Sequence, residues 1–189
     1  RMNSDNTSLS QAMRNTNDGI SLIQTAEGGL NELNNILVRM RELSVQAGNE
    51  TYNSTDRSMI ATEMTQLKNE YARIVTTANF NRTQLLNSTD TTFNIQVGIQ
   101  NTGNDRITIN MSSLAAAASN VGLNTVFTTS IASAGLLTQA QINISLIDSA
   151  LNNISTRRSR LGALQNRLEN ALSEASNYSQ NLSASQSQI

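Results

Sequence analysis

The chain has 189 residues and a formal net charge of −1, and it contains no histidine, cysteine, proline or tryptophan. The lack of histidine removes the commonest general base and metal ligand, and the lack of cysteine excludes disulfides and thiolate ligands. A chain that is nearly neutral offers no electrostatic case for binding nucleic acid. No apolar run approaches the roughly 20 residues that a membrane-spanning helix needs. Only 3% of the residues are aromatic, which favours helices buried along one narrow face over a thick core.

A long amphipathic helix is predicted from about Ser8 to Gln46. Its apolar side chains recur at steps of three, four and seven residues, which is the pattern of a helix packed along its length on another helix. The predicted stripe consists of Leu9, Met13, Ile20, Ile23, Leu30, Leu33, Leu37 and Met40. Gly19, Gly28 and Gly29 each weaken the helix by about 1 kcal/mol relative to alanine. They mark either a close approach of a neighbouring backbone or a tolerated local weakness.

A second helix is predicted over 56–78. Its apolar residues follow alternating steps of four and three, and they are Ile60, Met64, Leu67, Tyr71, Ile74 and Ala78. The segment 47–55 is rich in residues that favour turns, and Asp56 is the predicted N-cap. The two helices should therefore form an antiparallel helical hairpin.

The period then changes from that of a helix to that of a strand. Segment 79–87 is predicted to reverse the chain, with Phe80, Leu85 and Leu86 tucked under the helix ends. Apolar and polar residues alternate over 93–97 and over 107–111, with a glycine-containing loop between them, which predicts a β-hairpin. Because a two-stranded ribbon alone is marginal in water, its apolar face should lie on the helices.

A short helical turn is predicted over 114–118, and a linker rich in serine, threonine, alanine and glycine over 120–137. Thr138 and Gln141 fit a capping box, so the last helix is predicted over 138–189. Its apolar stripe consists of Ile147, Leu151, Ile154, Leu161, Leu168, Leu172, Ala175 and Leu182, and polar residues occupy three further positions of the stripe, Arg158, Gln165 and Ser179. This helix should lie against both earlier ones.

The fold class is therefore mainly α: an elongated bundle of three long helices with a small β-hairpin at one end. We expect one domain over 1–189, divided into 8–87, 92–112, the linker 120–137 and 138–189. Nothing in it builds a catalytic site, a metal site or a cofactor site. Six glutamates are predicted to be solvated or inter-subunit charges, and they are Glu27, Glu32, Glu42, Glu50, Glu63 and Glu70. Arg157, Arg158 and Arg160 fit either a phosphate site or, preferably, a solvated face or subunit contact.

Several long motifs occur in the order found in one protein family. The stretches NDGISLIQTAEGGLNELNNILVRMRELSVQAGN (17–49) and TDRSMIATEMTQLKNEYARIVTTANFNRTQLLN (55–87) resemble the N-terminal region of bacterial flagellins. The stretch 147–189 resembles the C-terminal region of the same family, and FNIQVG (93–98) followed by RITINM matches its hairpin segment. One departure is that family members usually carry some twenty further residues between the RMNS-like motif and the SLSQAMRNTNDG-like motif.

The resemblance implies a structural subunit of the flagellar filament that assembles into a helical polymer for motility and is not an enzyme. The long helices would be its rod-shaped core domain, D1, without the terminal segments that form D0. The segment 120–137 lies near where many flagellins insert outer domains. Implied partners are other flagellin subunits, the export chaperone, and the filament cap and junction proteins, with no nucleic acid and no membrane. The implied location is extracellular, reached through the flagellar export apparatus without a cleaved signal peptide.

The resemblance also implies candidate contact residues. Many flagellins are sensed by a vertebrate Toll-like receptor through an RxREL motif and a glutamate of the next helix, which correspond to Arg39, Leu43 and Glu63. The alternative is that Leu43 packs in the core or the filament wall and that the charges make subunit contacts. A different class of function is a hook–filament junction protein or an adhesin on the same helical core, although junction proteins usually diverge in the RELSVQ region, which is intact here.

Overall fold

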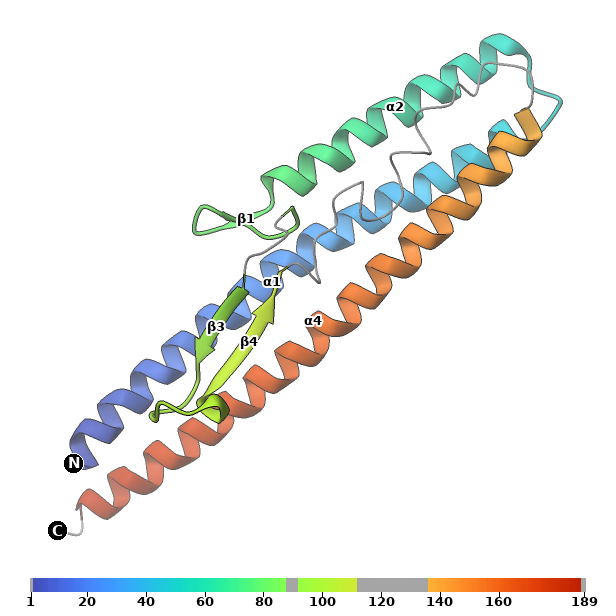
Figure 1. Ribbon diagram of the computed structural model, residues 1–189. Helices are drawn as coiled ribbons and strands as arrows, with labels where there is room; N and C mark the ends of the chain where they lie inside the picture. The colour runs from blue at the N-terminus through green and yellow to red at the C-terminus, as the bar shows by residue number, and fades with distance from the viewer. Residues whose placement is uncertain (1, 88–91, 112–135, 188–189) are drawn as a thin grey trace.

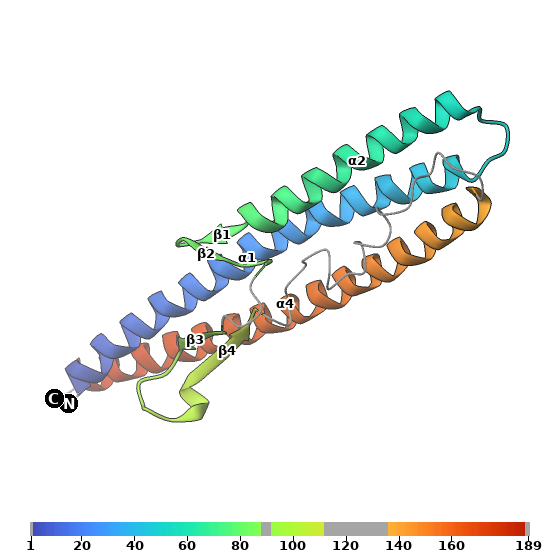
Figure 2. The same ribbon diagram turned by 45° about the horizontal axis from the view of Figure 1, so that its top comes forward.

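The computed structural model describes residues 2–87, 92–111 and 136–187. It contains three long helices, α1 (Met2–Ala47), α2 (Ser54–Thr77) and α4 (Leu136–Ser187). The molecule is an elongated rod in which α1 is packed on one side by α2 and along most of its length by α4 (Figures 1 and 2). At 1.5 Å per residue, α1 is about 69 Å long and α4 about 78 Å long. The predicted fold class is confirmed, but the prediction that the last helix lies against both earlier helices holds only for α1, on which α4 packs.

Helices α1 and α4 run antiparallel and meet along a seam with a regular seven-residue repeat. A Cβ added to Gly19 would lie 3.2 Å from Leu168, and one added to Gly48 would lie 3.3 Å from Ala140, so both contacts fix one register. Stepping by seven residues along both helices from Gly19 and Leu168 meets a buried residue at every step from the Ala12 and Ala175 level to the Ala47 and Ala140 level. The resulting facing pairs are Ala12 with Ala175, Gly19 with Leu168, Ala26 with Leu161, Leu33 with Ile154, Met40 with Ile147, and Ala47 with Ala140.

The N-terminal half of the α1 seam differs from the predicted stripe. Met13 and Ile20 are only half-buried, and the seam instead runs through Ala12, Thr16 and Gly19. The Thr16 hydroxyl donates to the Ala12 carbonyl at 2.8 Å, so its burial leaves no unpaired hydroxyl. The predicted stripe omitted Ala12, Thr16 and Gly19 because it was defined by large apolar side chains. Such a pattern does not distinguish a buried small residue from an exposed one.

The corner between α1 and α2 is closed by polar groups. Asn53, not Asp56, is the N-cap of α2: its side chain accepts from the backbone N–H groups of Thr55 and Asp56, at 2.8 and 2.9 Å. Asp56 is the third residue of the helix and accepts from the Asn53 N–H at 3.3 Å, which completes a capping box. The predicted seam of α2 is confirmed, with Ile60, Met64 and Tyr71 buried and the remaining three residues half-buried against the core.

Two small antiparallel hairpins follow α2. Strands β1 (Asn79–Phe80) and β2 (Thr83–Gln84) form the predicted chain reversal, and Leu85 and Leu86 after it are fully buried. Strands β3 (Thr92–Gln96) and β4 (Arg106–Asn110) form the second hairpin, with the turn η1 (Gly103–Asp105) in its loop. Ile107 and Ile109 are buried while the residues alternating with them are exposed, so the predicted apolar face of the hairpin is confirmed.

The start of α4 differs from its predicted boundary. The helix begins at Leu136, so Thr138 is a residue inside it and not at the predicted N-cap position. The predicted helical turn at 114–118 and most of the linker 120–137 lie outside the described residues. At the other end of the rod, α1 begins at Met2, in a segment to which sequence patterning assigned no structure.

The three glycines of α1 differ in how closely other side chains approach them. A Cβ added to Gly29 would lie 2.8 Å from the Cδ1 atom of Leu86, and one added to Gly19 would lie 3.2 Å from Ile95 and from Leu168. Both glycines therefore mark a close approach, by neighbouring side chains rather than by a backbone. Gly28 has nothing within 4 Å of such an atom, so it is the tolerated local weakness.

Candidate interaction surface

The predicted contact residues lie on α1 and on α2, near the corner end of the rod. Arg39 of α1 donates from Nε to Glu63 of α2 at 2.8 Å and from Nη1 to Glu42 at 3.0 Å. About half of the surface of each of these three side chains is exposed, between 45% and 60%. The hydrogen bonds to Glu42 and then to Glu63 raise the pKa of Arg39 above its ordinary value. The structure thus brings Arg39 and Glu63 together as a charged cluster that spans the helical hairpin.

Leu43 does not belong to that exposed cluster. Its side chain is 1% exposed and is part of the main hydrophobic core. Although Arg39 and Leu43 are one helical turn apart, Arg39 lies at the outer edge of the helix and Leu43 faces inward. The contact role assigned to Leu43 stays a prediction, and its position is the one expected of a core residue.

Several exposed apolar side chains belong to the same end of the rod as the charged cluster. Val38, Val45 and Met59 are 42%, 53% and 66% exposed, and they belong to α1 and α2 at the corner end. Ile142, near the start of α4, is 44% exposed. Single apolar side chains on a surface are normal, and four of the six large apolar side chains that are exposed in the described part of the chain lie toward this end.

The position of α2, and hence of Glu63, depends on Arg57. This side chain is 7% exposed and donates to three main-chain carbonyls of the corner: Tyr52 at 3.0 Å, Asn49 at 3.2 Å and Ala47 at 3.5 Å. Two of the three residues lie in the corner and the third is the last residue of α1, whose final carbonyls have no partner within the helix. Sequence patterning missed Arg57 because an arginine in a first helical turn is normally read as solvated.

The three clustered arginines of α4 do not converge on one site. Arg158 pairs with Glu27 of α1 at 3.7 Å, and its Nε atom is buried. Arg157 is half-buried, and burial lowers its pKa. Arg160 is exposed. A phosphate site built from all three is therefore not formed, and the solvated-face alternative fits Arg160.

Four of the six glutamates predicted to be solvated or inter-subunit charges also form ion pairs within the chain. Glu27, Glu42, Glu63 and Glu70 each form an ion pair with an arginine of the same chain. Because these side chains are largely exposed, each pair contributes little to stability, typically below about 1 kcal/mol. Their main effect is to hold the charged groups at defined positions on the surface.

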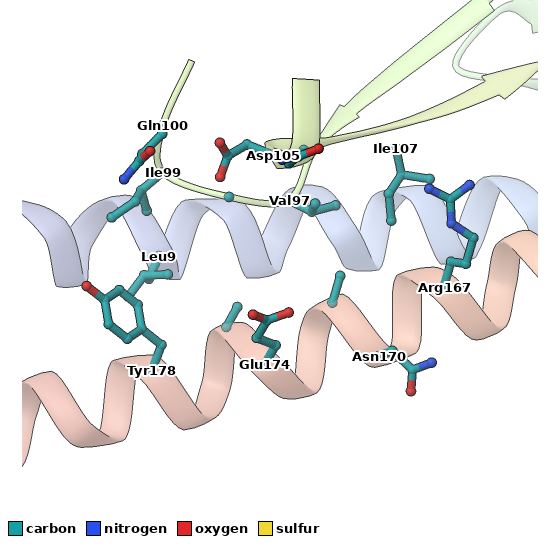
Figure 3. Close-up of a pocket in the computed structure, with 14 residues that line it drawn as sticks. Leu9, Val97, Ile99, Gln100, Asp105, Ile107, Arg167, Asn170, Glu174 and Tyr178 are labelled. Atoms are coloured by element: carbon teal, nitrogen blue, oxygen red, sulfur yellow. The ribbon is translucent and has the colours of Figure 1, made fainter. Parts of the chain in front are cut away.

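A groove lies near the opposite end of the rod, between the hairpin loop and the helices α1 and α4 (Figure 3). Its volume is about 610 Å³, and its lining is mixed, with Leu9, Ile107 and Tyr178 beside the charged Arg167 and Glu174. These groups do not form a nucleophile–base pair, and the described residues contain no group of three potential metal ligands. Nor does any helix in the described part of the chain have the length and apolar character needed to cross a membrane.

Comparison with known proteins agrees with this geometry. The sequence model of the bacterial flagellin N-terminal helical region matches residues 1–91, and that of the C-terminal helical region matches residues 144–189. The flagellin of Halalkalibacterium halodurans is 43% identical over 96% of this chain, and the flagellin of Listeria innocua is 36% identical over 100% of it. This chain spans 64% of the first relative and 68% of the second.

Two solved structures share the fold. The crystal structure of Bacillus cereus flagellin superposes with a TM-score of 0.74 at 30% identity, covering 86% of this chain and 88% of that one. A putative flagellar hook-associated protein from Vibrio parahaemolyticus gives a TM-score of 0.77 at 12% identity, covering 100% of this chain and 94% of that one, which is a likeness of fold alone. On the sequence matches and the shared helical rod, the chain belongs to the bacterial flagellin family.

Proposed function

We propose that this chain is the rod-shaped D1 core of a structural, non-enzymatic subunit of the bacterial flagellar filament. Membership of the flagellin family is the observation that carries the proposal. The subunit is exported through the flagellar apparatus without a cleaved signal peptide and works outside the cell. Its partners are copies of itself, together with an export chaperone and the cap and junction proteins of the filament.

The architecture suits a polymer. The long seam between α1 and α4 is closed within one molecule, so the outer faces of the rod are left for other copies. Contacts that join unlike surfaces of identical subunits, and that do not close into a ring, generate a helical filament. The exposed Val45, Met59 and Ile142 at the corner end supply apolar surface for such contacts.

The test compares two lengths of the protein. We expect the 189-residue chain to sediment as a monomer and the longer protein, with D0 segments at both ends, to polymerise, because those segments order only on assembly. Analytical ultracentrifugation and electron microscopy of both proteins measure this. Filaments formed by the 189-residue chain alone would contradict the role given to the terminal segments.

A genetic experiment separates a filament subunit from the alternative of a junction protein or adhesin. Deleting the gene of a filament subunit should leave cells with a hook and no filament. Deleting the gene of a junction protein should leave hooks while flagellin monomers accumulate in the medium. Accumulation of another flagellin in the medium would overturn the proposed function.

A second candidate function is recognition by a vertebrate flagellin-sensing Toll-like receptor, favoured by the exposed Arg39–Glu63 pair. We expect Arg39→Ala and Glu63→Ala to reduce receptor-reporter signalling, while Arg73→Ala, which removes an exposed arginine that pairs with Glu70 of the same helix, leaves it unchanged. Leu43→Ala is unsuitable because truncating a buried leucine costs about 2–5 kcal/mol of stability. Equal signalling by Arg39→Ala and Arg73→Ala would exclude this role for Arg39.

A further inference from the structure

The apolar residues of the seam between α1 and α4 do not by themselves specify how the two helices are aligned lengthwise. Its facing residues repeat every seven positions on both helices, and moving α4 by one heptad, about 10 Å, again places apolar residues opposite apolar residues. Leu33 would then face Leu161 in place of Ile154, and Ala26 would face Leu168. Apolar burial is non-directional, so it does not strongly separate these arrangements.

Polar contacts cross the same seam at three levels. At the corner end, Arg41 Nε donates to Asp148 Oδ1 at 2.6 Å. In the middle of the rod, Arg158 pairs with Glu27 at 3.7 Å, and its buried Nε has no hydrogen-bond partner among the described residues.

The third level lies at the end that holds Met2. There the Ser179 hydroxyl donates to the Asn6 side chain at 2.5 Å, and the Asn6 amide donates to Ser183 at 3.3 Å. All three levels agree with the register that Gly19 and Leu168 define. Each of them is broken when α4 moves by one heptad.

The two ion pairs have opposite polarity, and this makes a slip unfavourable in both directions. Asp148 and Arg158 lie ten residues apart on α4, and their partners on α1 carry the complementary order of charge. A one-heptad slip that brings Ala12 level with Leu182 moves Arg41 from Asp148 to the level of residue 155. Arg41 then lies three residues, or less than one helical turn, from Arg158. The opposite slip moves Glu27 from Arg158 to the level of residue 151, which is three residues from Asp148. Either movement replaces an attraction by a repulsion between like charges.

We propose that the reversed ion pairs Arg41–Asp148 and Glu27–Arg158 select one register of the α1–α4 seam from among those that its apolar heptads allow. Polar groups in a heptad seam are an established means of specifying register at some cost in stability. The register determines which residues on the outer faces of α1 and α4 stand level with each other. The proposal concerns the single chain and does not depend on filament assembly.

Cross-linking can read the register directly, because the chain contains no cysteine. Cysteines at Ala12 and Ala175 report the observed register, and cysteines at Ala12 and Leu182 report a slip of one heptad. Each pair is oxidised to a disulfide in the intact 189-residue chain, which requires no space for a reagent between the facing side chains, and far-UV circular dichroism confirms that the helices are kept.

The decisive variant is Arg41→Glu. In the observed register it places a glutamate beside Asp148, and in the slipped register it places that glutamate close to Arg158. We expect cross-linking of the Ala12/Leu182 pair to rise at least tenfold over the parent chain. Combining Arg41→Glu with Asp148→Arg restores complementary charges and should return cross-linking to the Ala12/Ala175 pair. Arg73→Glu makes the same change of charge on the exposed side of α2 and should leave both yields unaltered.

A second variant keeps the proposal testable if Arg41→Glu fails to fold. The Arg41→Gln, Glu27→Gln double variant removes both attractions without adding a repulsion. It should raise the slipped-pair yield at least threefold. Cross-linking confined to the Ala12/Ala175 pair in the folded variants would show that the apolar layers and the docked hairpin fix the register alone, and would overturn the proposal.

Discussion

The guanidinium of Arg57 donates a hydrogen bond to the main-chain carbonyl of Tyr52 at 3.0 Å, and this contact joins the first turn of α2 to the corner before it. Its other nitrogens reach the carbonyls of Ala47 and Asn49. Removing this buried arginine takes a donor from all three carbonyls, although that of Asn49 keeps the Tyr52 N–H at 3.4 Å, and lost hydrogen bonds in a partly buried corner are costly. Arg57 therefore ties the start of α2 to the corner and to the end of α1.

We expect Arg57→Met to lower the free energy of unfolding by about 3 kcal/mol, because the methionine fills part of the space and donates no hydrogen bond. Arg57→Lys should recover less than half of that loss, since one ammonium cannot reproduce the planar fork of donors. Urea denaturation followed by far-UV circular dichroism measures both variants. Arg14→Met, at an exposed position of α1, is the matched control, and an equal loss in Arg14→Met and Arg57→Met would contradict the role of the corner contacts.

The adjacent glycines of α1 should respond in opposite directions to alanine. Gly28→Ala should raise the free energy of unfolding by about 0.5–1 kcal/mol, because alanine is the better helix former and the added methyl group meets nothing within 4 Å. Gly29→Ala places that methyl group 2.8 Å from the buried Leu86, and the overpacking should outweigh the same gain, for a net loss of about 1 kcal/mol. Thermal unfolding of both variants decides it, and a gain at Gly29 would show that Leu86 moves aside freely.

The β1–β2 turn carries two residues with positive φ. Asn81 and Arg82 have φ angles of 46° and 66°, as a two-residue hairpin of type I′ requires. Asparagine tolerates this region, whereas arginine is strained there by about 1 kcal/mol. Arg82→Gly should therefore stabilise the protein more than Asn81→Gly does. Chemical denaturation of the pair measures the difference, and a larger gain at Asn81 would refute the assignment of strain to Arg82.

Alkaline pH should unfold the protein in part through Tyr71. Burial raises the pKa of this phenol above its ordinary value, so the folded state keeps the proton that the unfolded state loses above about pH 10. The stability that Tyr71 contributes is therefore fully present below about pH 10 and is lost as the pH rises further, by up to about 1.4 kcal/mol per pH unit. Arg157, which lies close enough to favour the phenolate, offsets only part of this effect.

The variant Tyr71→Phe isolates that contribution. Denaturation midpoints measured from neutral to alkaline pH should fall less steeply in Tyr71→Phe than in the parent chain. Tyr178→Phe, at a ring that is 47% exposed, should keep the parental slope. Parallel curves for the parent chain and Tyr71→Phe would mean that the phenol is not protected by the fold.

The parts of the fold that sequence predicted well are those with large apolar side chains at regular spacing. Ile60, Met64 and Tyr71 predicted the seam of α2, and the alternation over 93–97 and 107–111 predicted the hairpin. Ala12 was missed, and Gly19 was noted only as a possible close approach, because a small residue is recognised as part of a seam only when its partner on α4 is known. The α2 cap was assigned three residues late, since both Asn53 and Asp56 are good caps and only the local backbone decides between them.

The candidate surface was predicted less completely than the fold. Family motifs pointed to Arg39 and Glu63, and the two side chains meet at 2.8 Å across the helical hairpin. They also pointed to Leu43, which one-dimensional spacing placed beside Arg39 but which the packing of α2 and α4 on α1 buries. The three-level polar contact between α1 and α4 could not be found from sequence, because it depends on the register of segments more than a hundred residues apart.

The seven-residue spacing of buried positions on α1 and α4 has a geometric consequence for the surface. An α-helix has 3.6 residues per turn, so a strict seven-residue repeat drifts by about 20° per heptad unless the two helices wind around each other in a left-handed sense. The outward-facing sides of both helices turn with that winding, by roughly 100° over five heptads. A neighbour that touches α1 beside Val45 and one that touches it beside Ser8 would therefore approach the rod from different directions.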